Sequence, residues 1–215
     1  SGFAKLWFDT HVKVNLKPTV QDRYETIIRF HLVPYFGDRP LTEITHLDVE
    51  QFKANNVRAL VGNTEKKIAP KTVNEHICVL SSMFSSAVKW GYLKANPCVG
   101  VPRLRLPVQE MQFYDRRQTE AFLAKAAQIE PDLYAFFATA FKTGLRLGEL
   151  LGLEWGDIDF VSGTIHVQRS HSEGHTTTPK SGKPRTVPMT PVLIKILKEH
   201  RHLKGKLVFC RPNGS

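Results

Sequence analysis

Arg146 and Glu149 are charged residues in the apolar segment TGLRLGELLGLEWGDID, residues 143–159. A guanidinium in apolar surroundings is costly unless it is paired or meets an anion. Glu149 follows Arg146 by three residues, within reach on a helix, so a buried ion pair is one interpretation. A single carboxylate satisfies only part of a five-donor guanidinium. The unused donors favour a second interpretation, in which Arg146 receives an anionic ligand such as a phosphate.

Lys180 is a second candidate for chemistry, in the stretch TTTPKSGKPRTVPM, residues 176–189. The Thr, Ser and Gly residues around it predict the tip of a β-hairpin, with turns in the region from Gly174 to Gly182. A lysine on a mobile tip can move onto a ligand and donate a proton. Without further context, an exposed loop lysine is the simpler interpretation.

Metal and nucleotide sites are not expected. His171 and His175 are spaced H-x-E-x-H in a hairpin, where helical geometry does not apply, and the zincin pattern is H-E-x-x-H. His200 and His202 are expected on different faces of a helix. The chain has no Gly-x-x-x-x-Gly-Lys-Ser/Thr loop to hold a phosphate. We therefore expect no metal and no cofactor.

The charge of the chain indicates its class of partner. The formal net charge is +10 over 215 residues. Residues 1–100 carry 13 Lys and Arg against 9 Asp and Glu, and the remainder 17 against 11. Positive charge on both halves suits a polyanion such as double-stranded DNA, although solubility alone would also explain it. Three widely spaced cysteines favour a reducing, cytoplasmic setting, and no apolar run reaches the length of a membrane span.

The first hundred residues predict short amphipathic helices. One covers 19–32, with Thr19 and Asp22 as a capping pair, and ends at Pro34 and Gly37. Thr45 with Asp48 begins another. The clearest helix is 70–90, in which apolar residues recur every three or four positions and so form one face. Its opposite face is small and polar and can lie against a phosphate backbone, although a merely solvated face fits as well.

Residues 96–109 contain three prolines and no helical period, which predicts a linker between domains that carries Arg103 and Arg105. The second half predicts helices followed by a small antiparallel sheet, an α+β domain. The expected helices cover 116–127, 132–142, 146–153 and 192–202. The expected strands cover 158–160, 164–168 and 185–188, with a further one over 207–209.

Two segments of the second half resemble the catalytic domain of the tyrosine recombinases, the phage integrase family. These are TGLRLGELLGLEWGDIDF and TPKSGKPRTVPM. The first half resembles that family's core-binding domain in LVPYFGDRPLTEITHLDVEQF and KTVNEHICVLSSMFSSAVKWGYLKANP. The resemblance implies a mainly α chain with a small antiparallel sheet. Its helical SAM-like, DNA-binding domain would cover 1–98, its linker 99–112 and an incomplete catalytic domain 113–215.

The resemblance also implies a function, site-specific recombination or integration of double-stranded DNA by protomers that form a tetramer on paired sites. A tyrosine would attack the scissile phosphate, leaving a 3′-phosphotyrosine and a free 5′-hydroxyl. Arg146, rigid and poorly hydrated in its helix, would bind the phosphate oxygens, Glu149 would orient Arg146, and Lys180 would protonate the 5′-oxygen. The residues expected to contact DNA are Lys71, Thr72, Asn74, Arg103, Arg105, Lys183 and Arg185. The expected location is cytoplasmic, on the nucleoid.

The family's remaining catalytic residues are a His-x-x-Arg motif, a further His or Trp, and the tyrosine, all after the lysine. The five tyrosines are Tyr24, Tyr35, Tyr92, Tyr114 and Tyr134, and all precede Arg146. His166 and Arg169 match the motif only by coincidence, because residues three apart on a strand face opposite sides. We expect a piece of a longer recombinase that is inactive alone. The alternatives are a non-catalytic DNA-binding protein or truncated regulator, and a helical protein-interaction module.

Overall fold

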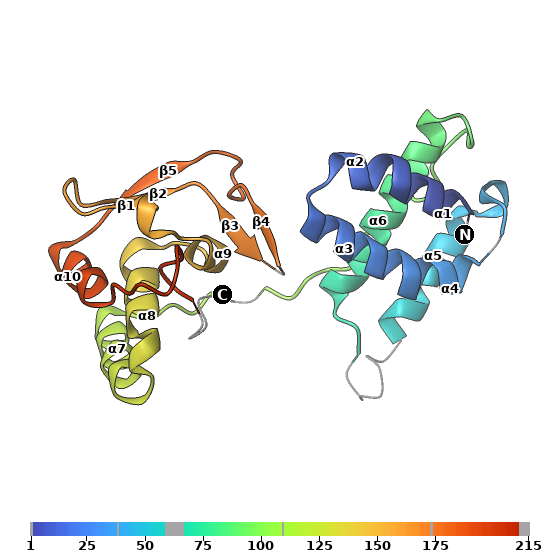
Figure 1. The fold of residues 1–215 in the computed structure, drawn as a ribbon. Coiled ribbons are helices and arrows are strands. Elements are labelled where there is room, and N and C mark those ends of the chain that lie inside the picture. The colour runs from blue at the N-terminus through green and yellow to red at the C-terminus, as the bar shows by residue number, and fades with distance from the viewer. Residues whose placement is uncertain (1, 38, 59–66, 109, 173, 211–215) are drawn as a thin grey trace. The chain divides into compact units, whose positions relative to one another are not determined.

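The computed structural model describes residues 2–37, 39–58, 67–108, 110–172 and 174–210. The chain divides into two compact units, Ser1–Glu110 and Met111–Ser215 (Figure 1). The first unit is helical. Its elements are α1 Gly2–Trp7, the π-helix η1 Phe8–Val12, α2 Lys13–Asn15, α3 Pro18–Ile27, the π-helix η2 Ile28–Leu32, α4 Val33–Phe36, the 3₁₀-helix η3 Leu41–Glu43, α5 His46–Arg58 and α6 Pro70–Lys89.

The boundaries of α3 differ from the sequence prediction at both ends. Pro18 occupies the first turn, where its missing N–H costs nothing, and no side chain caps the helix, so the predicted Thr19–Asp22 capping pair is wrong. Pro34 is the second residue of α4, and the helical run continues through it, so the prediction that Pro34 ends the helix is wrong. The helical run ends at Gly37, whose positive φ of 59° favours glycine.

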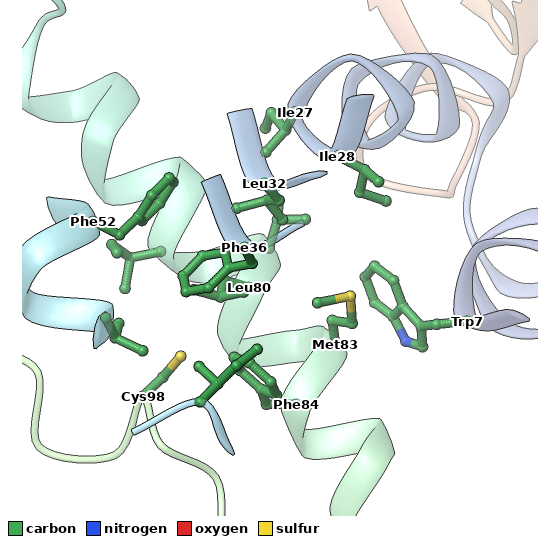
Figure 2. Packing of buried hydrophobic residues seen from close by; sticks show 14 of the residues in the cluster. Trp7, Ile27, Ile28, Leu32, Phe36, Phe52, Leu80, Met83, Phe84 and Cys98 are labelled. Atoms are coloured by element: carbon green, nitrogen blue, oxygen red, sulfur yellow. The ribbon is translucent and has the colours of Figure 1, made fainter. Parts of the chain in front are cut away.

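The helix α6 is the centre of the first unit and matches its predicted bounds. It contacts α1, α3, α5 and η2. Its predicted apolar face is buried and packs with Trp7, Leu32, Phe36 and Phe52 (Figure 2). The predicted start of α5 is also confirmed, because Thr45 and Asp48 exchange hydrogen bonds between side chain and main chain.

Residues 96–104 are fastened to α5 and α6, although the sequence predicts a linker there. Lys53 donates to the carbonyl oxygen of Pro102 at 3.0 Å, and His46 Nδ1 lies 3.1 Å from that of Pro97. The amide of Asn74 donates to the carbonyl oxygen of Leu104 at 3.0 Å and accepts from its N–H at 2.9 Å. The first part of the predicted linker therefore packs as part of the first unit.

His76 is a buried titratable group in the same unit, 1% exposed. Its ring stacks on that of His31 with centroids 4.0 Å apart, and its Nδ1 lies 3.0 Å from the amide oxygen of Asn56. Burial is the main cause that lowers the pKa of His76 to about 4, the His31 charge acts in the same direction, and Glu75 acts in the opposite direction. The folded unit therefore holds this imidazole in its neutral form.

The stability of the first unit is expected to fall as the pH drops from about 6.5 to about 4. The unfolded chain protonates His76 near pH 6.5, whereas the folded chain resists it until about pH 4. The pKa difference corresponds to roughly 3 kcal/mol at the acid end of this window. Urea unfolding at several pH values measures it. His76→Gln should remove this contribution, and an equally steep pH dependence in that variant would contradict the assignment.

The second unit is a helical layer with two small antiparallel sheets. The helix α8 packs against α7, α9 and α10, and a buried core that includes Leu150, Ile165 and Leu197 joins the helices to the sheet. The elements are α7 Arg116–Ile129, α8 Pro131–Thr143, α9 Leu147–Leu151, the 3₁₀-helix η4 Trp155–Asp157, β1 Ile158–Asp159, β2 Thr164–Val167, β3 Ser170–Ser172, β4 His175–Thr177, β5 Arg185–Pro188 and α10 Pro191–Glu199.

The sheets differ in part from the prediction. One has the order β1-β2-β5, with Val167 opposite Arg185, and its strands lie within the predicted ranges. The other pairs β3 with β4, so the region from Gly174 to Gly182 contains a strand and is not a single turn. The predicted strand over 207–209 is reduced to an isolated bridge between Leu207 and Glu154.

Candidate active site

Arg146 lies at the junction between α8 and α9. Gly144 ends α8 in the left-handed conformation at φ 64°, and Arg146 is the extended N-cap residue of α9. The expectation of a poorly hydrated arginine inside an apolar helix is wrong, because 57% of the Arg146 side chain is exposed. Leu147 and Leu151 are exposed as well. Only some of the leucines of α9 face the core, and Arg146 lies at the surface.

Glu149 is the buried member of the site, with 1% of its side chain exposed. Its Oε1 accepts from Arg146 Nη1 at 3.1 Å, and its Oε2 accepts from the main-chain N–H of Arg146 at 2.9 Å. The second bond is the reach-back of a residue at the third helical position, which caps the helix. Glu149 therefore holds Arg146 by both main chain and side chain.

Arg185 approaches the same carboxylate from the start of β5. Its Nη1 donates to Oε1 of Glu149 at 2.8 Å and its Nη2 to Oε2 at 2.7 Å, a bidentate pair. This pair, more than the bonds from Arg146, lowers the pKa of Glu149 to about 2 against the cost of burial. The prediction that Arg185 contacts DNA missed this pair, which nothing in the local sequence pattern signals.

Lys180 lies in the turn that joins β4 to β5. The N–H of Gly182 donates to the carbonyl oxygen of Pro179 at 2.9 Å and closes the turn, with Gly182 at φ 71°. Lys180 and Lys183 are both exposed. The chain thus presents a lysine on a tight turn five residues before Arg185, the residue that is anchored on Glu149.

The helix α9 packs against β3 through two glycines. A Cβ on Gly148 would lie 2.4 Å from Oγ of Ser170 and 3.0 Å from the carbonyl oxygen of His171. A Cβ on Gly152 would lie 3.2 Å from the N–H nitrogen of His171. Side chains at these positions would displace the strand. Two glycines four residues apart on a helix are the signal that could have revealed this contact.

Arg169 forms another ion pair with a buried carboxylate in this unit. Its Nη2 lies 2.6 and 2.7 Å from the two carboxylate oxygens of the buried Asp157, and its Nε donates to the carbonyl oxygen of Gly152 at 3.3 Å. Gln168 donates to the same carboxylate at 2.6 Å. These bonds fasten the end of α9 to the segment that leads into β3.

The residues predicted to contact DNA in the first unit lie at the start of α6 and on the fastened segment. Lys71 and Thr72 are exposed. Arg103 and Arg105 are also exposed, on either side of Leu104, which Asn74 holds. Both polar atoms of the Asn74 amide are used in that contact, so Asn74 shapes this surface by holding the segment.

The histidines form no metal centre within the part of the chain that the structure describes, where no group of three His, Cys, Asp or Glu residues is placed to bind an ion. His171 Nδ1 lies 2.9 Å from Oγ1 of Thr176. The rings of His200 and His202 both approach the carbonyl oxygen of Val208, at 3.0 and 3.1 Å. The expectation that these two point to different faces of a helix is wrong, because α10 ends at Glu199.

Two family models match the chain. Residues 112–215 match the phage integrase family, and residues 1–54 match the phage integrase N-terminal SAM-like domain. The chain belongs to the phage integrase family of tyrosine recombinases. The predicted fold, a SAM-like helical domain followed by the fold of the integrase catalytic domain, is confirmed.

The integrase family members that resemble the chain include mobile-element proteins. The chain is 31% identical to the ICEBs1 integrase of Bacillus subtilis over 91% of its own length and 52% of the relative's, so it spans about half of that protein. The Tn1549 transposon integrase in complex with circular intermediate DNA has the same fold, with a TM-score of 0.80 and 20% identity over 99% of this chain and 71% of that one. A lambda integrase tetramer bound to a Holliday junction also has this fold. Its TM-score is 0.75 and its sequence identity is 16%, over 98% of this chain and 59% of that one.

None of the helices in the described parts of this family member combines the length and the apolar composition that crossing a bilayer requires.

Proposed function

We propose that this chain is the DNA-binding and partial catalytic region of a tyrosine recombinase that cuts and rejoins double-stranded DNA at specific sites. The observation that carries this proposal is the half-exposed guanidinium of Arg146. Within the described residues its Nη1 is bound to Glu149, and its other side-chain donors have no protein acceptor. Two arginines share the single charge of Glu149, so the cluster keeps a net positive charge for an incoming phosphate.

The roles follow from the placement of each group. Arg146 binds the nonbridging oxygens of the scissile phosphate and stabilises the charge that develops on them. Glu149 orients Arg146. Lys180, exposed on its turn, moves onto the departing 5′-oxygen and protonates it. The proposed chemistry needs no ATP, because the phosphotyrosine bond conserves the energy of the phosphodiester. It uses no metal, because Arg146 supplies the positive charge that stabilises the phosphate.

The nucleophile of this reaction is a tyrosine that follows the lysine in the family. All five tyrosines of residues 1–215 precede Arg146. We therefore propose that this chain alone forms no covalent complex with a suicide substrate that carries a nicked target site. A covalent adduct formed by the 215-residue chain would contradict this.

The partners under this proposal are duplex DNA and further protomers. The lambda integrase relative forms a tetramer on a Holliday junction, and we propose the same assembly for a complete protein that contains these residues. Its site of action is the DNA of the nucleoid, in the cytoplasm.

DNA binding by this chain is expected to weaken steeply as the salt concentration rises. The net charge of +10 and the exposed Lys71, Arg103 and Arg105 supply phosphate contacts. Each phosphate neutralised adds a slope of about −0.9 to a log–log plot of affinity against salt. Fluorescence anisotropy at several salt concentrations measures it. Binding that is absent at low salt would favour the helical protein-interaction module instead.

Replacement of Lys180 with alanine is expected to slow cleavage in a complete recombinase, and a substrate with sulfur at the 5′-bridging position should restore much of the rate. A thiolate leaves without needing the proton that Lys180 donates. Rates on oxygen and sulfur substrates measure the rescue. Lys183→Ala, three residues along the same exposed segment, serves as the control and should show no selective rescue. Equal slowing on both substrates would contradict proton donation by Lys180.

A further inference from the structure

The carboxylate of Glu149 receives donors from both sides. Each oxygen accepts two hydrogen bonds, one from Arg146 and one from Arg185, so its acceptor sites are filled. The contacts from Arg185, at 2.8 and 2.7 Å, are shorter than those from Arg146, at 3.1 and 2.9 Å. A bidentate fork fixes the plane of a carboxylate. Arg185 therefore sets the orientation of the group that holds Arg146.

The charge balance gives Arg185 a second effect. Glu149 and Arg146 alone would form a neutral pair, in which the carboxylate offsets the positive charge that an anionic ligand needs. With Arg185 the cluster is two guanidiniums around one carboxylate, and one positive charge remains. Because 57% of the Arg146 side chain and 35% of that of Arg185 are exposed, whereas 1% of Glu149 is, the positive charge faces solvent.

Arg185 also links the two catalytic segments through the fold. It pairs with Val167 in the β2–β5 ladder and follows the Lys180 turn. Through Glu149 it is attached to the first turn of α9. The strand that leaves the Lys180 turn is thus anchored on the residue that orients Arg146.

We propose that Arg185 is a positioning residue, which orients Glu149 and preserves the positive charge that Arg146 presents to the scissile phosphate. This inference rests on the proposed function and assigns Arg185 a role in strand cleavage in place of a direct contact with DNA. Arg116 provides a control in the same unit. Its side chain is 92% exposed and, among the described residues, pairs only with the exposed Glu120, so it touches neither Arg146 nor Glu149.

The first experiment measures single-turnover cleavage and DNA affinity in a recombinase that contains residues 1–215 and continues to the tyrosine. Arg185→Gln is expected to lower the cleavage rate by about a hundredfold, with the dissociation constant changed less than about threefold. Arg185→Lys should recover only part of the rate, because lysine cannot form two parallel bonds to a carboxylate. Arg116→Gln, which removes an exposed guanidinium away from the cluster, should cleave within about threefold of the parent. Equal losses in Arg185→Gln and Arg116→Gln would overturn the proposal.

The second experiment separates failure of this inference from failure of the proposed function. The carboxyl carbon of Glu149 is followed by NMR titration in the 215-residue chain. Arg185→Gln is expected to raise the pKa of Glu149, and Arg116→Gln should leave that pKa unchanged. A parent that does not cleave refutes the proposed function, and this titration still tests the contact. Suppose that the parent cleaves, that Arg185→Gln cleaves at the same rate, and that the pKa of Glu149 does not change. This outcome refutes only the positioning role of Arg185.

Discussion

Replacing Arg146 with alanine in a complete recombinase is expected to slow strand cleavage by about a hundredfold or more and to leave most of the DNA affinity intact. Under the proposed function, Arg146 is one phosphate contact among many in binding, but it faces the charge that develops on the scissile phosphate. Loss of one well-aimed donor at such a position costs roughly 3–4 kcal/mol of transition-state stabilisation. Suicide substrates measure the cleavage rate, and anisotropy titrations measure the affinity.

The control for this variant is Arg116→Ala in the same unit. Arg116 is 92% exposed and pairs only with the exposed Glu120 among the described residues. Its removal takes away the same charge without touching the Glu149 cluster, so cleavage should stay close to the parent rate. A recombinase with Arg146→Ala that cleaves as fast as the parent would refute the assignment of Arg146.

The substitution Phe84→Ala is expected to destabilise the first unit by about 3–5 kcal/mol. Phe84 is 0% exposed and lies on α6 in the core shown in Figure 2. Removal of its ring loses buried apolar area and leaves a cavity at the centre of the unit. Urea unfolding followed by the fluorescence of the buried Trp7 measures the loss.

The matched control is Phe30→Ala. Phe30 lies on η2 in the same unit, is 61% exposed and stacks with the guanidinium of Arg29. The same chemical change at this surface position should alter stability by no more than about 0.5 kcal/mol. Similar losses in both variants would mean that α6 does not form the core of the unit.

Local patterns in the sequence predicted several elements correctly. Apolar residues recur every three or four positions along α6, which predicts a helix with one buried face. This prediction needs no knowledge of residues far away in the sequence. The Thr45–Asp48 cap is likewise a contact between near neighbours. Pro34 failed as a stop signal because the helical run continues through it. The π-helix η2 leads directly into α4, and π-helical turns are local irregularities of the α-helical hydrogen-bond ladder.

The candidate site was predictable only in part. The spacing of Arg146 and Glu149 correctly indicated a contact. The sequence could not show which of the two is buried, because that depends on Arg185, 36 residues after Glu149. A short helix that begins at Arg146 also leaves that side chain at its exposed end, and the apolar composition of residues 143–159 concealed this. Burial was inferred from composition where the geometry of a helix terminus decided it.

The packing of β3 against Gly148 and Gly152 has a consequence for the cooperativity of the site. A five-residue helix with an internal glycine is unstable by itself, so α9 persists because the strand and its caps hold it. Local opening of the β3–β4 hairpin would release α9, and Arg146 would lose its fixed geometry in the same event. The amides of α9 and of the hairpin are therefore expected to exchange as one opening unit, and the fraction of molecules with an assembled Arg146–Glu149 cluster should equal the fraction in which that unit is closed.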